Sequence, residues 1–294
     1  MAVMRSGSDK VFHAANYSLV AILALLCVLP FVHVLALSFS SAIAADKGIV
    51  GLWPVQFTTA AYEFAFSQSL FLRAIWNTIK RVLLGVALNI ALITITAYPL
   101  SKRKEVFPGR GVFAWFFMAT MLVNGGLIPT YLVVTWTGLR NTIWALVLPG
   151  AVYAFNVALL LNFFRQIPAE IEESAFLDGA GSWRVLLSLY VPLSVPALAT
   201  LTIFSTVGHW NEWFHGLIYL DSMRDYPLQT YLQGVIIDPS TALVDVSQVE
   251  LMLRISRKNF NSAQIVIATV PVIAVYPFLQ RYFVKGLMIG SLKG

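Results

Sequence analysis

Six apolar stretches dominate the sequence and limit the class of protein that it can form. Each is about as long as the roughly 20 residues that an α-helix needs to cross the hydrocarbon core of a bilayer. They cover residues 17–39, 79–100, 112–135, 142–164, 185–209 and 263–283. Composition agrees, because only 12% of the residues are charged, against about 25% in soluble proteins. The sequence therefore predicts an all-α membrane protein with six transmembrane helices.

Basic residues in the short connections set the expected orientation. The connection between the second and third stretches carries four Lys and Arg residues at positions 102–110, whereas the next connection carries only Arg140. Because cytoplasmic connections are enriched in Lys and Arg, the first of these should lie inside the cell. Six crossings then place both termini and the connection 165–184 in the cytoplasm, and the segment 214–262 outside.

The N-terminal stretch admits two interpretations. A basic start, an apolar run and small residues at 42–45 are typical of a cleavable signal peptide. The apolar run 19–37 is longer, however, than the about 7 to 15 residues usual in such a peptide. We therefore expect an uncleaved first helix, and we expect residues 1–294 to form a single membrane domain.

The connection 165–184 predicts a short amphipathic helix. Pro168 suits a first helical position, and Gly179 and Gly181 suit an ending. The acids gather mostly near the positive end of the helix dipole, and three apolar residues spaced by four form one stripe. The acids are Glu170, Glu172, Glu173 and Asp178, and the apolar residues are Ile167, Ile171 and Ala175. A helix lying passively on lipid headgroups is the alternative, but acids match an anionic inner leaflet poorly, so we expect a protein partner.

Lys80 and Arg81 come at the outer end of the second stretch. They are either anchors whose stems lie along apolar surface or a cationic collar for an anionic solute. Acidic and basic residues nearly balance on the outer side of the expected topology. Charge alone therefore does not choose between the two interpretations.

Two of the stretches contain amides at membrane depth. Asn124-Gly125-Gly126 weakens the third stretch as a helix, which indicates either a kink that lines a pathway or packing through small residues. In the fourth stretch, Asn156 and Asn162 are six residues apart, so they lie about 240° apart around a helix. One of them can line a pathway while the other joins helices, and the sequence does not say which.

Aromatic and polar residues follow the fifth stretch near the outer boundary. Trp210-Asn211-Glu212-Trp213 is either part of an aromatic belt or a platform on which sugar rings stack. The polar segment 214–262 comes next and contains the turn-like Asp238-Pro239-Ser240. An outer segment of this length is more often functional than a plain connection.

The chain carries none of the common catalytic motifs. It has no phosphate loop, no His-Glu-x-x-His and no Gly-x-Ser-x-Gly. Its four histidines are scattered and it has one cysteine, Cys27, so we predict no metal site and no internal disulfide. A membrane enzyme acting on a lipid-linked glycan would need ionisable groups that converge within the membrane, whereas the acids lie mostly in connections. A channel or secondary transporter that works without an ATPase is a further alternative.

The segment 173–192 resembles a known motif. Glu173-Ser174-Ala175, three residues, Gly179, nine residues and then Leu189-Tyr190-Val191-Pro192 are similar to the EAA motif of binding-protein-dependent ABC importers. Nearly the whole chain resembles the second permease subunit of maltose-type carbohydrate importers, most of all the branch that handles complex or acidic polysaccharides, including alginate. The further segments that carry this resemblance are residues 178–180, 192–196, 210–211 and 280–294.

The resemblance implies a type I ABC importer permease fold with a cytoplasmic coupling helix. It implies a homologous second permease, a pair of ATPase subunits that bind ATP and Mg, an extracytoplasmic solute-binding protein and an oligosaccharide solute, in the lipid of a bacterial inner membrane. No cofactor of this chain and no nucleic-acid partner are implied. The residues expected to dock on the ATPase are Glu172, Glu173, Ser174, Ala175, Asp178 and Gly179; those expected to contact the binding protein are Asp238, Pro239 and Ser240; and those expected to line the pathway are Asn124, Asn156, Trp210, Asn211, Glu212, Lys80 and Arg81.

Overall fold

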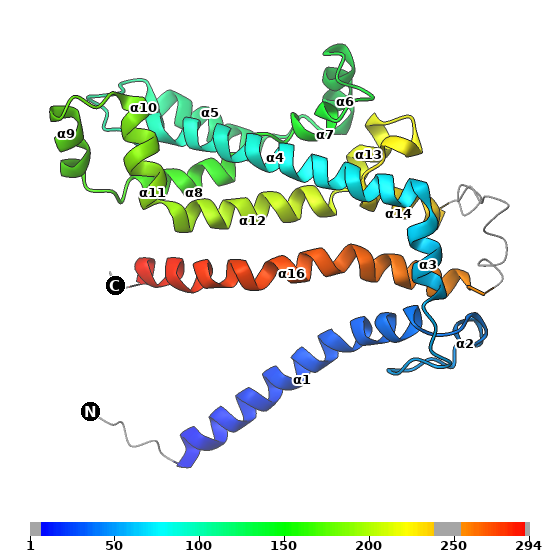
Figure 1. Cartoon of the computed structure of the whole chain (residues 1–294). Coiled ribbons are helices and arrows are strands. Elements are labelled where there is room, and N and C mark those ends of the chain that lie inside the picture. The colour runs from blue at the N-terminus through cyan, green and yellow to red at the C-terminus, as the bar shows by residue number, and fades with distance from the viewer. Residues whose placement is uncertain (1–6, 238–253, 292–294) are drawn as a thin grey trace. The chain divides into compact units, whose positions relative to one another are not determined.

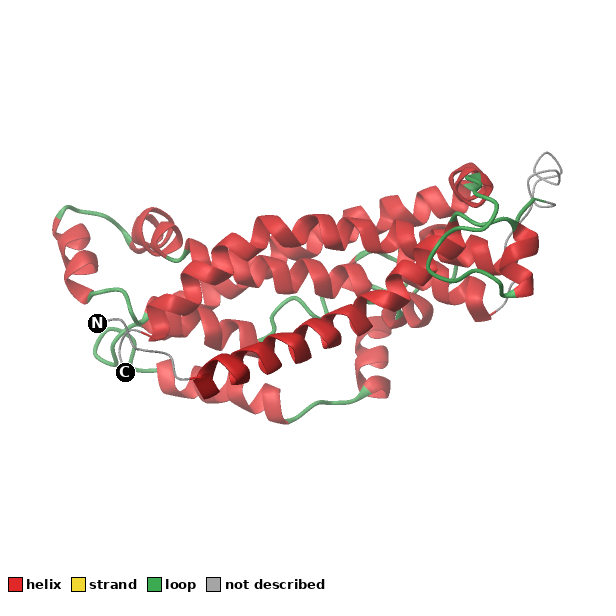
Figure 2. Ribbon diagram, turned by 90° about the horizontal axis from the view of Figure 1, so that it is seen from below, coloured by secondary structure: helices red, strands yellow, loops and turns green. Residues whose placement is uncertain are grey.

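The computed structural model describes residues 7–237 and 254–291, and every regular element within these ranges is a helix (Figure 2). The predicted all-α class is therefore confirmed. Contacts divide the chain into two compact units, Met1–Ser69 with Ala242–Pro271, and Leu70–Thr241 with Val272–Gly294.

The first unit contains α1 (Gly7–Ser38), α2 (Ala42–Lys47), α3 (Ala60–Ser67) and the beginning of α16 (Arg257–Ser291). Asn259 Nδ2 donates to the Ser40 carbonyl over 3.0 Å, and the Phe64 and Phe260 rings lie 5.1 Å apart. These contacts fix the start of α16 against the short helices. Most large apolar side chains of α1 are exposed, as expected of a helix that faces lipid.

The second unit begins with the long helix α4 (Ser69–Ser101), which starts ten residues before the predicted second stretch. The other elements follow in chain order. They are α5 (Arg110–Leu122), α6 (Leu127–Trp136), α7 (Trp144–Val147), α8 (Ala154–Phe164), α9 (Ala169–Leu177), α10 (Ser182–Val185), the π-helix η1 (Leu186–Tyr190), α11 (Val191–Leu193), α12 (Val195–Asn211), α13 (Phe214–Tyr219), the 3₁₀-helix η2 (Met223–Asp225) and α14 (Leu228–Ile237).

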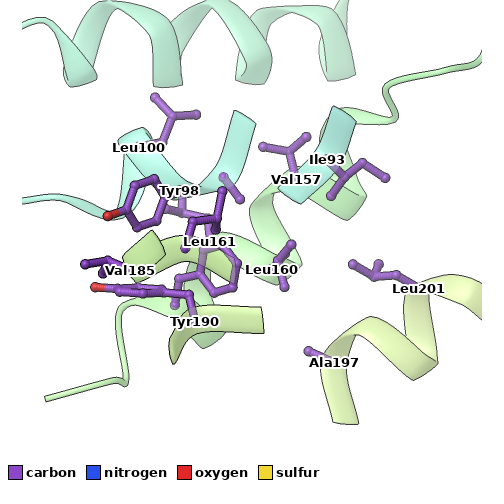
Figure 3. Close-up of a cluster of buried hydrophobic side chains, with 13 residues drawn as sticks. Ile93, Tyr98, Leu100, Val157, Leu160, Leu161, Val185, Tyr190, Ala197 and Leu201 are labelled. Atoms are coloured by element: carbon purple, nitrogen blue, oxygen red, sulfur yellow. The ribbon is translucent and has the colours of Figure 1, made fainter. Parts of the chain in front are cut away.

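One apolar core joins the helices of the second unit. In Figure 1, α4, α8 and α12 run side by side, and Figure 3 shows that their side chains meet those of α10 and η1. Ile93 and Tyr98 come from α4, Leu160 from α8, Tyr190 from η1 and Leu201 from α12. All five are less than 9% exposed. This core holds the C-terminal part of α4 against α8 and α12.

All six predicted stretches fall on helices, but the third, fourth and fifth are interrupted. The third divides into α5 and α6, which meet at 118° around the predicted weak point 124–126. The fourth divides into α7 and α8, because Pro149 lacks an amide donor and is followed by Gly150. The fifth bends by 82° at Ser194, between Pro192 and Pro196.

Some of these helices are long and apolar enough to span a membrane. Among the described residues, Val11–Ser38 of α1 and the whole of α4 can each cross a membrane as one helix. The two bent pairs, α5 with α6 and Ser182–Leu193 with α12, satisfy the same test if each pair is counted as one span. Helix α16 covers the sixth predicted stretch and continues through Pro271 and Pro277.

Candidate functional site

Helix α9 has the boundaries that the sequence predicts. It follows Pro168, and Gly179 just beyond its end has φ +81°, in the left-handed region. The Gly179 amide donates to the Phe176 carbonyl and the Ala180 amide to the Ala175 carbonyl, each over 3.0 Å, which caps the helix. A Cβ at Gly179 would meet no atom within 4 Å, so glycine is needed here for its backbone conformation.

Glu172 is directed toward its own chain rather than toward a partner. It forms an ion pair with Lys102 and accepts a hydrogen bond from the Tyr190 hydroxyl over 2.6 Å. Lys102 Nζ also lies 3.7 Å from the centre of the Tyr98 ring and 4.1 Å from that of Tyr190. The side chains of Lys102 and Glu172 are only 9% and 15% exposed. Lys102, Glu172, Tyr98 and Tyr190, here called the Lys102 cluster, therefore bind α9 to α4 and η1.

Burial and the neighbouring charge shift the pKa of Lys102 in opposite directions. Burial lowers the pKa of its ammonium, while the hydrogen bond and the charge of Glu172 raise it, and the net shift is downward. The ion pair with Glu172 and the faces of the two tyrosine rings are what make a cation tolerable at this position. Lys102 was not among the expected site residues, because its partners Glu172 and Tyr190 lie 70 and 88 positions away in the sequence.

The other expected docking residues divide into an exposed and a covered group. Glu173, Ser174 and Asp178 are exposed, whereas Ala175 packs against the apolar core. The exposed surface also contains apolar side chains, Phe176 at 43% and Leu177 at 89%. The free surface of α9 is thus acidic and apolar, and Ala175 faces away from it.

Arg81, in the N-terminal half of α4, forms an ion pair with Glu212, whose side chain is 25% exposed. Arg81 Nη2 lies 2.6 Å from Glu212 Oε2, Nη1 donates to the Glu212 carbonyl over 2.9 Å, and Nη2 donates to the Leu146 carbonyl over 3.3 Å. Arg81 is 2% exposed. The expectation of a solvent-reaching anchor is wrong for Arg81, because its guanidinium finds three acceptors inside the protein.

Glu212 follows the last residue of α12 and is held on two sides. Burial would raise the pKa of its carboxyl, but hydrogen bonds from His215 and the charge of Arg81 outweigh burial and lower the pKa to about 2. The His215 amide donates to Glu212 Oε1 over 2.8 Å. Glu212 therefore stays ionised at neutral pH and neutralises Arg81.

A cavity of about 290 Å³ lies beside this pair, among α4, α7, α8 and α12. Asn89, Asn156, Ser205 and His209 contribute polar groups to its wall, and Tyr153 and Phe204 contribute aromatic rings. Asn89 Nδ2 donates to Ser205 Oγ over 2.7 Å. Three buried atoms, Arg81 Nε, Asn89 Oδ1 and His209 Nε2, have no hydrogen-bond partner in the described part of the chain.

Close packing of α4 on α12 shapes the cavity wall. A Cβ at Gly85 would lie 2.3 Å from His209 Nε2, so only glycine allows the imidazole to lie against α4 at this point. Asn156 is 7% exposed and lines the cavity, whereas Asn162 is exposed. The prediction that these two asparagines lie on different faces of their helix is confirmed.

The remaining expected residues lie elsewhere. Lys80 is exposed, with Nζ 5.5 Å from the Trp76 ring, beside a separate hollow of about 210 Å³. Asn124 and Asn211 are exposed, Trp210 is half-buried, and none of the three lines the cavity beside Arg81. Asp238, Pro239 and Ser240 lie outside the described residues. Asn89 and Ser205 were missed, although polar residues within apolar stretches are a recognised sign of function.

Comparison with known proteins gives concordant matches. A family of proteins described as binding-protein-dependent transport system inner membrane components matches residues 110–289. The chain is 37% identical over 288 residues to the polygalacturonan/rhamnogalacturonan transport system permease protein YtcP of Bacillus subtilis (strain 168), covering 97% of this chain and 99% of that protein.

Two solved structures share the fold. One is a chain of a bacterial ABC transporter involved in the import of the acidic polysaccharide alginate, with 35% identity and a TM-score of 0.88, covering 95% of this chain and 99% of that chain. The other, at 15% identity and a TM-score of 0.58, belongs to a bacterial alginate ABC transporter in complex with an alginate pentasaccharide-bound periplasmic protein, and covers 92% of this chain and 93% of that one.

Proposed function

Because the chain belongs to the inner membrane components of binding-protein-dependent transport systems, we propose that it forms half of the pathway of an importer for acidic oligosaccharides or polysaccharides. The chain is a non-catalytic permease subunit of an ABC sugar importer, which works with a binding protein and other subunits. The observation that carries the proposed cargo is the match, along almost the whole chain, to a polygalacturonan/rhamnogalacturonan permease. The alginate importer chain, similar at 35% identity, supports the same class of solute.

Uptake by the reconstituted importer tests the cargo. With its own binding protein, the importer should take up labelled oligouronides and should take up neutral maltodextrins of equal length poorly. Thermal stabilisation of the binding protein by the same sugars gives a second, independent measurement. Preferred uptake of neutral chains would contradict an acidic cargo while leaving the permease role in place.

Coupling to ATP hydrolysis is the second part of the proposal. The exposed surface of α9, with Glu173, Phe176 and Leu177, docks on one subunit of an ATPase pair that binds ATP and Mg. The exposure of its acidic and apolar side chains supports this role, because Glu173 stays 65% exposed although it lies 3.9 Å from Arg103. Glu172 and Ala175 take part indirectly, since they hold α9 against α4 and the apolar core.

Substitutions on α9 test the docking surface. Glu173→Lys and Leu177→Ser should weaken copurification of the ATPase subunits and reduce solute-stimulated ATP hydrolysis, because each removes one chemical component of the surface. Asn162→Leu, which changes an exposed residue of α8, is the control. Wild-type hydrolysis and uptake in both α9 variants would exclude this surface as the docking site.

The third part of the proposal is the orientation of the chain in the membrane. The basic connection 102–110 and α9 lie on the cytoplasmic side with both termini, in a bacterial inner membrane that also holds a homologous second permease. The segment 214–262 lies outside and contacts the binding protein through Asp238, Pro239 and Ser240. Deleting residues 238–240 should impair transfer of solute from the binding protein while ATPase docking persists; equal loss of both would refute a specific contact.

A further inference from the structure

A second pocket, of about 400 Å³, lies where α9 and α10 approach the last turns of α4 (Figure 1). It is here called the Trp183 pocket, and it shares no residue with the cavity beside Arg81. Its volume falls within the about 300 to 1,000 Å³ of pockets that hold small ligands. Its wall is mostly apolar and includes Ile95, Val106, Phe107, Phe176, Trp183 and Leu186.

The Trp183 pocket extends along α4 from the depth of acyl chains to the depth of headgroups. Residues 82–100 of α4 carry no charged side chain and are about as long as the roughly 20 residues that cross a hydrocarbon core. Ile95 lies five residues before the end of this uncharged part, about 8 Å at a rise of 1.5 Å per residue. Lys102 lies just beyond that end, and both side chains line the pocket.

The wall of the pocket is open to the surroundings of the protein. Ile95, Val106 and Trp183 are 45%, 72% and 64% exposed. Tryptophan is enriched where headgroups meet acyl chains, so the exposure of Trp183 fits this depth. A soluble partner docked on α9 does not reach a wall inside the hydrocarbon layer. The occupant must therefore be amphipathic, with an apolar part beside Ile95 and a polar part beyond the end of α4.

A compact loop borders the polar end of the pocket. The Val106 and Phe107 amides donate to the Arg103 carbonyl over 3.1 Å and 3.0 Å. Arg110 Nη1 donates to the Lys102 carbonyl over 2.5 Å. These hydrogen bonds fold residues 102–110 into one turn, which supplies both apolar wall residues and basic side chains.

The charges of this loop favour an anionic group. Its basic residues are Lys102, Arg103, Lys104 and Arg110, and the acids beside them are Glu105, Glu172 and Glu173. Four basic residues and three acids leave one positive charge. Lys102 is already paired with Glu172, and Arg103 lies 3.9 Å from Glu173, whereas Lys104 is exposed. Basic residues directly beyond a membrane helix attract the phosphates of anionic lipids.

We propose that the Trp183 pocket binds one anionic phospholipid, with an acyl chain along Ile95 and Trp183 and its phosphate beside Lys104. Glu172 and Phe176 of α9 belong to the same wall, so the lipid helps to hold α9 against α4. The inference goes beyond the proposed function, because it requires neither a particular cargo nor an ATPase. Only the assignment to the cytoplasmic leaflet rests on the proposed orientation.

Quenching of tryptophan fluorescence by lipids with brominated acyl chains tests the site in the assembled importer. Nanodiscs of phosphatidylcholine receive increasing fractions of brominated phosphatidylglycerol in both leaflets, so the result does not depend on orientation. The difference between each protein and its Trp183→Phe counterpart isolates the quenching of Trp183. This quenching should saturate while phosphatidylglycerol is still a minor component. Brominated phosphatidylcholine should instead quench in proportion to its fraction throughout.

Two variants and a control locate the lipid. Lys104→Gln should raise the half-saturating lipid fraction about fivefold, the factor expected from one basic residue near a lipid surface. Ser182→Phe, which fills the pocket from an exposed position in its wall, should remove the saturable quenching without a change of charge. Arg73→Gln is the control, because Arg73 is exposed on the first turns of α4, and it should behave as the wild type. Val106→Phe replaces Ser182→Phe if the latter does not copurify with the partner subunits.

Each contrary outcome overturns a stated part of the proposal. Equal, unsaturable quenching by both lipids would mean that Trp183 meets ordinary boundary lipid. Absence of quenching would mean that protein covers the pocket, and saturation that persists in the assembled pocket-filling variant would place the lipid elsewhere. Failure of the importer to take up oligouronides would contradict the proposed cargo and leave saturable quenching of Trp183 in support of the lipid site.

Discussion

Lys102→Met should loosen α9 without changing the surface that this helix presents. The substitution keeps most of the apolar stem but removes the cation that Glu172 and the rings of Tyr98 and Tyr190 surround. Glu172 then keeps only the Tyr190 hydroxyl as a partner. The contact that attaches α9 to α4 is lost, while Glu173, Phe176 and Leu177 stay as they are.

The magnitude follows from the burial of the pair. Removing one partner of a fully buried ion pair costs about 3 to 5 kcal/mol. Glu172 keeps 15% exposure and one hydrogen bond, so we expect a cost below this range, about 2 to 3 kcal/mol. Since about 1.4 kcal/mol corresponds to a factor of ten, the equilibrium for local opening of α9 should shift roughly 30- to 140-fold.

Hydrogen exchange of the amides of residues 169–177 in the assembled importer, without nucleotide, measures this opening. Arg103→Met is the matched control, because the pair of Arg103 with Glu173 is 3.9 Å long and its side chains are 69% and 65% exposed. An exposed pair of this kind contributes less than about 1 kcal/mol. Equal acceleration of exchange in the two variants, or none in Lys102→Met, would refute the reasoning.

Three further predictions concern single positions. Gly179→Ala should destabilise the importer by about 1 to 2 kcal/mol, because residue 179 has φ +81°. Thermal unfolding measures this loss of stability. Gly181→Ala is the control and should have a much smaller effect, because residue 181 has φ −76°. Gly85→Ala should reduce assembly of the importer, because the new Cβ would lie 2.3 Å from His209 Nε2. Adding His209→Ala in the same chain should restore assembly. If it does not, the clash lies elsewhere. Glu212→Gln should lower the unfolding temperature at pH 7. The difference in unfolding temperature from the wild type should narrow as the pH falls from about 4.5 toward 2, because the pKa of Glu212 is lowered from 4.5 to about 2 in the folded state and the stabilisation by its charge is lost as the pH falls through the folded pKa. A difference that does not depend on pH would contradict an ionic role.

Features set by neighbours in the sequence were predictable, and those set by distant partners were not. The end of α9 at Gly179 and the break of the third stretch at residues 124–126 follow from glycines whose conformational freedom acts locally. Pro149-Gly150 is an equally local signal for the break between α7 and α8, but the unbroken apolar run around it concealed that signal. Such signals give the positions of helix ends but not the contacts of side chains.

Side-chain direction depends on residues far along the chain. Glu172 and Glu173 are adjacent acids in one motif, yet the first is 15% and the second 65% exposed, because Lys102 and Tyr190 reach only the first. Arg81 and Glu212 were both proposed as pathway residues, but their pairing spans 131 positions. No periodicity within either stretch could reveal that each residue neutralises the other.

The continuity of α4 connects the two ends of this unit. Arg81 and the last residue of the helix, Ser101, are twenty residues apart, which corresponds to about 30 Å at a rise of 1.5 Å per residue. Lys102 follows directly and is attached to α9, whereas the parallel route through α10 to α12 bends by 82°. A tilt of α4 by roughly 6° about its Lys102 end displaces Arg81 by about 3 Å over this length. A shift of that size exceeds the tolerance of a hydrogen bond, so a small rotation imposed at α9 is enough to rearrange the wall of the cavity beside Arg81, twenty residues away along the same helix.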